Sequence, residues 1–187
     1  MASSEDLIVI TGGPGSGKTT LIELLRGAGF ATTPEAGRAI IQDQTAIGGP
    51  ALPSKDPALF AELMLCWDIR SYRWALRQDG PVFFDHPIPG LTGYHRMMGL
   101  DVPPHVDAAV AAFPYRREVF IAPYWPEIYR TDTERRQTLD EAKRSHDSAV
   151  ECYTRCGYRL VELPRAAPEA RLRFVLDRLG VSRSSSR

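Results

Sequence analysis

The fold of this 187-residue chain is decided by one glycine-rich stretch near its start, Gly12-Gly13-Pro14-Gly15-Ser16-Gly17-Lys18-Thr19. The stretch fits the pattern GxxxxGK[ST] at every defined position. The apolar run 7–11 before it predicts a buried strand, and leucines at helical spacing after it predict a helix over about 18–26. A strand, a glycine-rich loop and a helix in this order indicate a phosphate-binding loop rather than a glycine turn with an incidental lysine.

The residue types of this loop suit a triphosphate bound together with Mg²⁺. Several backbone N–H groups must point into one hollow to meet phosphate oxygens, and glycines allow the necessary dihedral angles without a side chain in the way. The following helix adds the partial positive charge of its N-terminus. We expect Lys18 to reach the β- and γ-phosphates of ATP and the Thr19 hydroxyl to bind Mg²⁺. The expected nucleotide contacts are Gly12, Gly13, Pro14, Gly15, Ser16, Gly17, Lys18, Thr19, Thr20 and, after the last predicted strand, Pro164.

Working outward from the loop, short apolar runs alternate with helical patterns, which is typical of an α/β protein with a mainly parallel sheet. Right-handed connections between the strands then predict a doubly wound, five-stranded sheet with helices on both faces, in one domain over 1–181 with a disordered tail over 182–187. For 86–117 we predict only one helix, near 105–113. The expected strands cover 7–11, 30–33, 82–85, 118–121 and 158–163. The other expected helices cover about 18–26, 34–47, 57–79, 132–155 and 169–179.

Composition narrows the classes of protein to which the chain can belong. Lysine plus arginine equals aspartate plus glutamate at 23 each, so the charge balance predicts neither a nucleic-acid partner nor an acidic membrane. No apolar stretch approaches the length of a membrane span. The three cysteines, Cys66, Cys152 and Cys156, form no CxxC pair and predict neither a disulfide framework nor a zinc site. We therefore expect a protein of the reducing cytoplasm.

An acidic residue at the end of a second buried strand is the expected partner of Thr19 in binding Mg²⁺. Asp85 closes the apolar run 82–85, so it would hold the metal through water or orient an acceptor hydroxyl as a base. The alternative is an aspartate that only caps a turn or helix. His86 follows where motor ATPases of the AAA type carry a glutamate, and the chain contains no asparagine, which excludes the NKxD motif of GTPases.

Glu35 and Arg38 follow the second predicted strand and are the candidates for the acceptor side. Three residues apart, they share one helix face near the carboxyl ends of the strands, where open α/β sheets bind ligands. Glu35 could deprotonate an acceptor hydroxyl, and Arg38 could bind an anion with two hydrogen bonds. The alternative is a simple intrahelical ion pair. His95 and the other later histidines are expected at the surface.

Three arginines lie within seven residues after the fourth predicted strand, at positions 130, 135 and 136. Arginines brought in by a mobile segment can neutralise the oxygens of a transferring phosphoryl group. We expect an arginine-bearing lid here, with Arg130 and Arg135 as its catalytic residues and Arg136 next. The alternative is a solvated helix N-terminus with local ion pairs.

These motifs together resemble a known group of proteins. The phosphate loop, 34–38, the lid start 132–135, the stretch 156–164 and the helix start 168–171 occur in the same order in small bacterial predicted ATPases of the AAA type that look like nucleotide kinases. A relative of this appearance is the ribosylnicotinamide kinase domain of the bacterial NAD regulator. The resemblance implies a kinase-like strand order of 2-3-1-4-5, with ATP and Mg²⁺ as ligands.

Three functions remain open from the sequence alone. The first is a kinase that phosphorylates a hydroxyl of an unidentified small-molecule acceptor bound near Glu35, Arg38 and Asp85. The second is a slow ATPase that works as a nucleotide-dependent switch with a protein partner. The third is a degenerate nucleotide-binding protein, which the intact Lys18 and Thr19 oppose. Whether the chain forms a homodimer also stays open.

Overall fold

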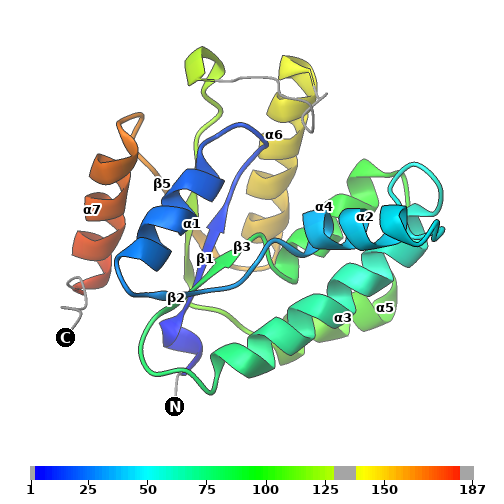
Figure 1. The fold of residues 1–187 in the computed structure, drawn as a ribbon, viewed down its shortest axis with the longest axis horizontal. Helices are drawn as coiled ribbons and strands as arrows, with labels where there is room; N and C mark the ends of the chain where they lie inside the picture. The colour runs from blue at the N-terminus through cyan, green and yellow to red at the C-terminus, as the bar shows by residue number, and fades with distance from the viewer. Residues whose placement is uncertain (1–2, 129–137, 182–187) are drawn as a thin grey trace.

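Five parallel strands form the central sheet of the computed structural model, which describes residues 3–128 and 138–181 (Figure 1). The strands are β1 (Leu7–Thr11), β2 (Ala31–Thr32), β3 (Val82–Asp85), β4 (Glu118–Ile121) and β5 (Arg159–Glu162). Their order across the sheet is β2-β3-β1-β4-β5, and every neighbouring pair is parallel. The doubly wound sheet and the kinase-like strand order are both confirmed.

Helices cover both faces of this sheet, as the sequence predicted (Figure 1). On one face, α1 and α7 pack against the apolar side chains of β1, β3 and β4; on the other, α3, α4, α5 and α6 do so, and α2 lies against α3. The helices are α1 (Lys18–Gly27), α2 (Ala36–Ala46), α3 (Pro57–Ala75), α4 (Pro89–Met97), α5 (Pro104–Ala112), α6 (Leu139–Arg155) and α7 (Pro168–Leu179). Short 3₁₀ helices cover Ser4–Asp6 and Pro126–Ile128.

Strand β1 shows why the central runs are continuously apolar. Successive side chains of a strand point to opposite faces, and here Leu7 and Val9 enter one core cluster while Ile8 and Ile10 enter the other. All four side chains are at most 1% exposed. A strand covered on both faces needs apolar residues at every position, which is the pattern that marked it in the sequence.

Helix α4 was not predicted, because its glycines and prolines indicate a loop. Gly90 and Gly93 instead allow close packing against neighbouring side chains. A Cβ atom at Gly90 would lie 2.4 Å from Nε2 of His86, and one at Gly93 would lie 3.0 Å from Oγ of Ser148 on α6. Because Gly90 and Gly93 have no side chains, α4 can pack close to the end of β3 and to α6. The helix forms although glycine has a low helix propensity.

Several predicted element boundaries are corrected by the structure. The second helix begins at Ala36, with Glu35 as its N-cap residue, and α3 ends at Ala75 rather than at 79. Helix α6 begins at Leu139, since Thr138 and Glu141 form a capping box there. The expected lid residues Arg130, Arg135 and Arg136, and the tail 182–187, lie outside the described residues.

His95 was expected at the surface, but it is buried at 2% exposure, and its Nδ1 lies 2.9 Å from the Leu91 carbonyl oxygen.

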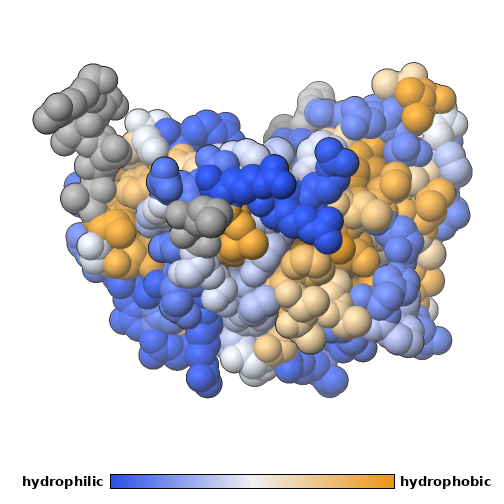
Figure 2. Space-filling model, turned by 90° about the horizontal axis from the view of Figure 1, so that it is seen from below, coloured by the Kyte–Doolittle hydropathy of each residue, from blue (hydrophilic) through white to orange (hydrophobic). Residues whose placement is uncertain are grey.

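The face seen in Figure 2 is mostly polar, with hydrophobic residues gathered mainly in its right half. Across the described ranges, no helix has the length and apolar character that crossing a bilayer requires.

Candidate active site at the carboxyl ends of the strands

The glycine-rich loop leaves β1 and enters α1 in a conformation that depends on its glycines. Gly12, Gly15 and Gly17 have φ values of 128°, 71° and 84°, which L side chains rarely adopt. A Cβ atom at Gly12 would also lie 2.7 Å from the Ala122 carbonyl oxygen. The Ser16 hydroxyl donates a hydrogen bond of 2.7 Å to the Gly13 carbonyl and closes the loop. The result is a concave backbone at a helix N-terminus, which fits a phosphate group.

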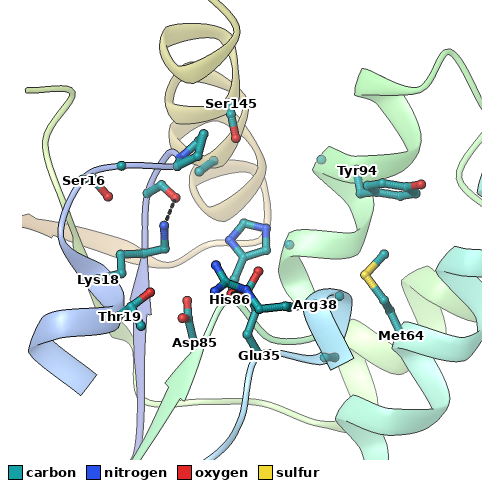
Figure 3. A pocket seen from close by; sticks show the side chains of 18 of the residues that line it. Ser16, Lys18, Thr19, Glu35, Arg38, Met64, Asp85, His86, Tyr94 and Ser145 are labelled. Atoms are coloured by element: carbon teal, nitrogen blue, oxygen red, sulfur yellow. Dashed lines mark hydrogen bonds and ion pairs between the residues drawn. The ribbon is translucent and has the colours of Figure 1, made fainter. Parts of the chain in front are cut away.

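Lys18 curls back over this loop (Figure 3). Its Nζ donates hydrogen bonds to the carbonyl oxygens of Gly12 and Gly13, at 2.7 and 2.8 Å. The ammonium group is thereby held above the hollow, and only its side-chain torsions have to change for it to meet phosphate oxygens. Thr19, in the first turn of α1, is exposed and lines the same cavity.

Asp85 ends β3 next to the end of β1, where it pairs in register with Ile10. Figure 3 shows its carboxylate between Thr19 on one side and Glu35 with Arg38 on the other. The side chain is 8% exposed. Burial raises the pKa of Asp85 to about 6; Glu35 adds to the rise, while Lys18 and Arg38 oppose it. Such a carboxyl group exchanges a proton near neutral pH, which suits a general base or a metal ligand.

His86, which follows Asp85, has a role that the sequence did not show. Among the described residues it is the only non-glycine residue with a positive φ, at 51°. Its Nδ1 lies 2.8 Å from the Thr11 hydroxyl, so it links the ends of β1 and β3. The side chain is accessible from the cavity, and the surrounding protein and the Lys18 ammonium lower the pKa of His86 below its usual range. A neutral imidazole in a strained backbone position is typical of a functional site.

Glu35 and Arg38 lie together at the cavity, as their spacing predicted. Nε of Arg38 is 3.7 Å from a carboxylate oxygen of Glu35, and both side chains are partly exposed, at 41% and 45%. Both also influence the ionisation of Asp85 across the cavity. The geometry thus contains the simple ion pair, and it also places both groups beside the candidate base. Their roles toward an acceptor stay predictions.

One cavity of about 1940 Å³ joins the phosphate loop to the space between α2, α3, α4 and α6. It takes in most of the loop together with Glu35, Arg38, Asp85 and His86. On the far side it is lined by side chains of α3 and α4, among them Met64 and Tyr94, which Figure 3 shows opposite Lys18. Helix α6 adds Ser145, which the sequence analysis did not single out. The cavity is large enough for two ligands side by side.

Arg171 on α7 holds the phosphate loop through a hydrogen bond to Ser16, and sequence reasoning missed it. The side chain is 3% exposed; its Nη1 donates to the Ser16 carbonyl at 2.6 Å and its Nε to the Pro164 carbonyl at 2.9 Å. Its guanidinium also lies 5.1 Å from the ring centroid of Trp125. Pro164 itself does not line the cavity, which is bordered instead by Ala166, Ala167 and Pro168. The expected nucleotide contact at Pro164 therefore stays a prediction, and the Pro164 carbonyl oxygen already accepts a hydrogen bond from Arg171.

Replacing Arg171 with methionine is expected to lower the free energy of unfolding by about 2 kcal/mol, because the buried Ser16 carbonyl and the partly buried Pro164 carbonyl lose a charged donor. It should also weaken nucleotide binding severalfold, since the loop loses its support. Chemical denaturation and calorimetry with Mg·ATP measure the two effects. Arg173→Met, at an exposed position of the same helix, is the matched control and should change neither. Equal stability of the two variants would contradict the supporting role.

Comparisons with known proteins find chains of similar fold among solved structures. A search of curated proteins returns no match. Among solved structures, NadR protein in complex with NR superposes with a TM-score of 0.68 at 16% identity, over 98% of this chain but 53% of that one, so the chain spans about half of NadR. Thymidylate kinase from Ehrlichia chaffeensis superposes with a TM-score of 0.59 at 16% identity, over 92% of this chain and 98% of that one. Deoxyadenosine kinase from M. mycoides superposes with a TM-score of 0.62 at 11% identity, over 93% of this chain and 98% of that one.

These likenesses in structure concern the fold, because the identities are low. The family itself is shown by sequence: a family model described as AAA domain matches residues 7–171, which include the phosphate loop, Asp85 and Arg171. The chain therefore belongs to the AAA domain family of P-loop nucleotide-binding proteins, with the five-stranded fold of the small-molecule kinases.

Proposed function

We propose that this protein is an ATP-dependent phosphotransferase that acts on a hydroxyl group of a small molecule. The observation that carries the proposal is the continuous cavity, with the phosphate loop at one end, an aromatic and apolar chamber at the other, and the buried Asp85 carboxyl group between them. The similarly folded proteins support it, since thymidylate, deoxyadenosine and shikimate kinases are named among them. A protein that only hydrolysed ATP would have no need of the second chamber.

The residues at the loop fit a triphosphate and a magnesium ion. The loop amides and Lys18 would hold the phosphates, while the Thr19 hydroxyl would bind Mg²⁺ and the Asp85 carboxylate would hold it through water; the ion neutralises phosphate charge when bound. Within the described part of the chain, no group of three or more His, Cys, Asp or Glu side chains could bind a metal by itself. This suits Mg²⁺, which is commonly bound by one or two protein groups together with substrate phosphates.

The same side chains can carry a direct transfer. The acceptor hydroxyl oxygen forms a bond to the γ-phosphorus, the bond from that phosphorus to the β,γ-bridging oxygen breaks, and ADP leaves. The hydroxyl proton passes to the ionised Asp85, whose raised pKa makes it a stronger base than an exposed aspartate. Glu35 and Arg38, at the edge of the cavity, would orient the acceptor. His86, held neutral, can donate or accept a hydrogen bond there without adding charge.

The sequence predicts that the arginines of the proposed lid act on the rate of phosphoryl transfer. Arg135→Ala is expected to lower kcat by about a hundredfold or more while changing nucleotide affinity only a few-fold, because a lid arginine acts on charge that develops during transfer. Steady-state kinetics and nucleotide titration separate the two quantities. Arg144→Ala, on the exposed face of α6, is the control. An unchanged kcat with weakened binding would assign Arg135 to nucleotide binding alone.

An acceptor panel tests the proposed function. The purified protein is incubated with Mg·ATP and a broad set of nucleosides, sugars, amino alcohols and hydroxylated antibiotics, and ADP and phosphorylated products are measured. We expect one chemical class to be phosphorylated and to raise ADP formation at least about tenfold over the background. Hydrolysis of ATP that no acceptor stimulates would overturn the proposal and favour the nucleotide-dependent switch. A partner that co-purifies only with the ATP-bound protein would then identify that switch.

A further inference from the structure

The far end of the cavity differs in charge from the phosphate end. We name it the distal chamber: the part lined by α3, α4 and the loop 48–56, including Phe60, Met64, Asp68, Tyr94 and Met97. The phosphate end is lined by charged side chains of both signs, the cationic Lys18, Arg38 and Arg171 and the acidic Glu35, Asp85 and Glu141. In the described lining of the distal chamber, Asp68 is the only charged side chain. The distal chamber therefore carries a single carboxyl group with no cationic side chain in its described lining.

Asp68 faces this chamber from the middle of α3. Phe60, Met64 and Asp68 are spaced by four residues, so they share one face of the helix, and all three line the cavity. The Asp68 side chain is 7% exposed. In the part of the chain that the structure describes, its carboxyl group forms no hydrogen bond or ion pair, and burial alone raises its pKa well above the usual range. Burying an ionised carboxylate without a counter-charge costs free energy. The Asp68 carboxyl group is therefore either protonated or paired with a bound cation.

The walls of the distal chamber suit a cation that has left water. The rings of Phe60 and Tyr94 lie 5.6 Å apart, and aromatic faces attract ammonium groups. Met64 and Met97 add polarizable thioether groups that adapt to an organic ligand. The Tyr94 hydroxyl is buried and has no hydrogen-bond partner among the described residues, and burial raises its pKa to about 12, so it remains a neutral hydrogen-bonding group.

We propose that the distal chamber binds a cationic nitrogen of the acceptor, with the Asp68 carboxylate as its counter-ion. The acceptor class is then a hydroxylated organic amine or quaternary ammonium compound: its hydroxyl lies toward Asp85 and its positive charge toward Asp68. The assignment of this ligand as an acceptor rests on the proposed function, whereas the binding of the cation does not. When the cation enters, Asp68 releases its proton to water, and the carboxylate and the cation form an ion pair inside apolar walls.

A structural role for Asp68 is the competing explanation. Tyr115 and Tyr153 are electrostatically coupled to Asp68, and their buried hydroxyls have no hydrogen-bond partner among the described residues. A water molecule joining these three groups would satisfy them all. Replacement of Asp68 would then change stability but not discriminate between ligands by charge, so selectivity between matched ligands is the decisive readout.

The test uses pairs of hydroxyl compounds that have similar shape but different charge: choline beside 3,3-dimethylbutan-1-ol, and phenylethanolamine beside 1-phenylethane-1,2-diol. Binding to the full chain is measured by calorimetry in the presence of Mg²⁺ and a non-hydrolysable ATP analogue. We expect the cationic member of at least one pair to bind about tenfold or more tightly than its neutral partner. Asp68→Asn should abolish this preference, whereas Glu62→Gln, the other acidic position of α3, should preserve it.

Transfer from ATP is measured on the same pairs. Cation-selective binding without any phosphorylated product would refute the kinase proposal and leave the cation site standing. Equal affinity within each pair in the wild type, or a preference that survives in Asp68→Asn, overturns the cation site whatever the kinase assay shows. The wild-type comparison needs no variant, so the proposal stays testable even if Asp68→Asn fails to fold.

Discussion

Replacing Lys18 with alanine is expected to lower kcat for phosphoryl transfer by about a thousandfold or more, because the charge on the β- and γ-phosphates then loses its nearest protein cation. The fold should be kept. The Lys18 ammonium donates hydrogen bonds to the carbonyl oxygens of Gly12 and Gly13, and water in the cavity that Gly12 lines can take its place. The rate of ADP formation with and without acceptor measures the effect.

Lys55→Ala is the matched control for this substitution. Lys55 is exposed in the loop between α2 and α3 and does not line the cavity, so its removal changes the net charge equally but leaves the phosphate site intact. We expect wild-type turnover from it. If Lys18→Ala and wild type turned over ATP at equal rates, no chemistry would depend on this loop, and the kinase proposal would be withdrawn.

The phosphate loop could be predicted from the sequence because its function depends on local backbone geometry. Gly12 and Gly17 are required by their own φ values, and Lys18 follows in the first turn of the same helix. Asp85 was predictable for a related reason: it ends an apolar run, and parallel strands bring their carboxyl ends to one edge of the sheet. Adjacent residues and strand order were enough in both cases.

The residues that were missed owe their positions to packing between distant segments. Arg171 donates to Ser16 across 155 positions in the sequence, and nothing near either residue indicates that contact. Asp68 lies on the apolar helix α3, and it faces a cavity only because α4 forms the opposite wall. Helix α4 was not predicted, because Gly90 and Gly93 indicated a loop. A single sequence does not distinguish a glycine that permits close helix packing from a glycine that ends a helix.

Asp85→Asn is expected to lower kcat by about a thousandfold, because the amide can neither accept the acceptor proton nor bind Mg²⁺ as an anion. In the wild type, kcat/KM should rise with pH and level off above about 6, the value to which burial raises the pKa of Asp85. Asp101→Asn, at an exposed position, is the control and should retain both the rate and the pH profile. If Asp85 is the base, kcat/KM should change roughly tenfold per pH unit below the pKa. A wild-type profile that is flat between pH 5 and 8 would rule out Asp85 as the base.

The same substitution should raise stability, and the sign follows from the pKa. The carboxyl group has a pKa of about 6 in the folded protein against 3.8 as its ordinary value, so folding disfavours the ionised form. Above pH 6 the folded state carries that penalty, on the order of 3 kcal/mol, and the penalty fades as the pH falls toward 4, where the folded state keeps its proton. Asp85→Asn should therefore unfold at higher denaturant concentration than wild type at pH 8, with the difference nearly gone at pH 4. A group that costs stability at the pH where it is ionised, and whose loss removes turnover, is placed for chemistry; if Asp85→Asn were instead less stable at pH 8, the carboxylate would be a structural cap and the base would have to be sought at Glu35.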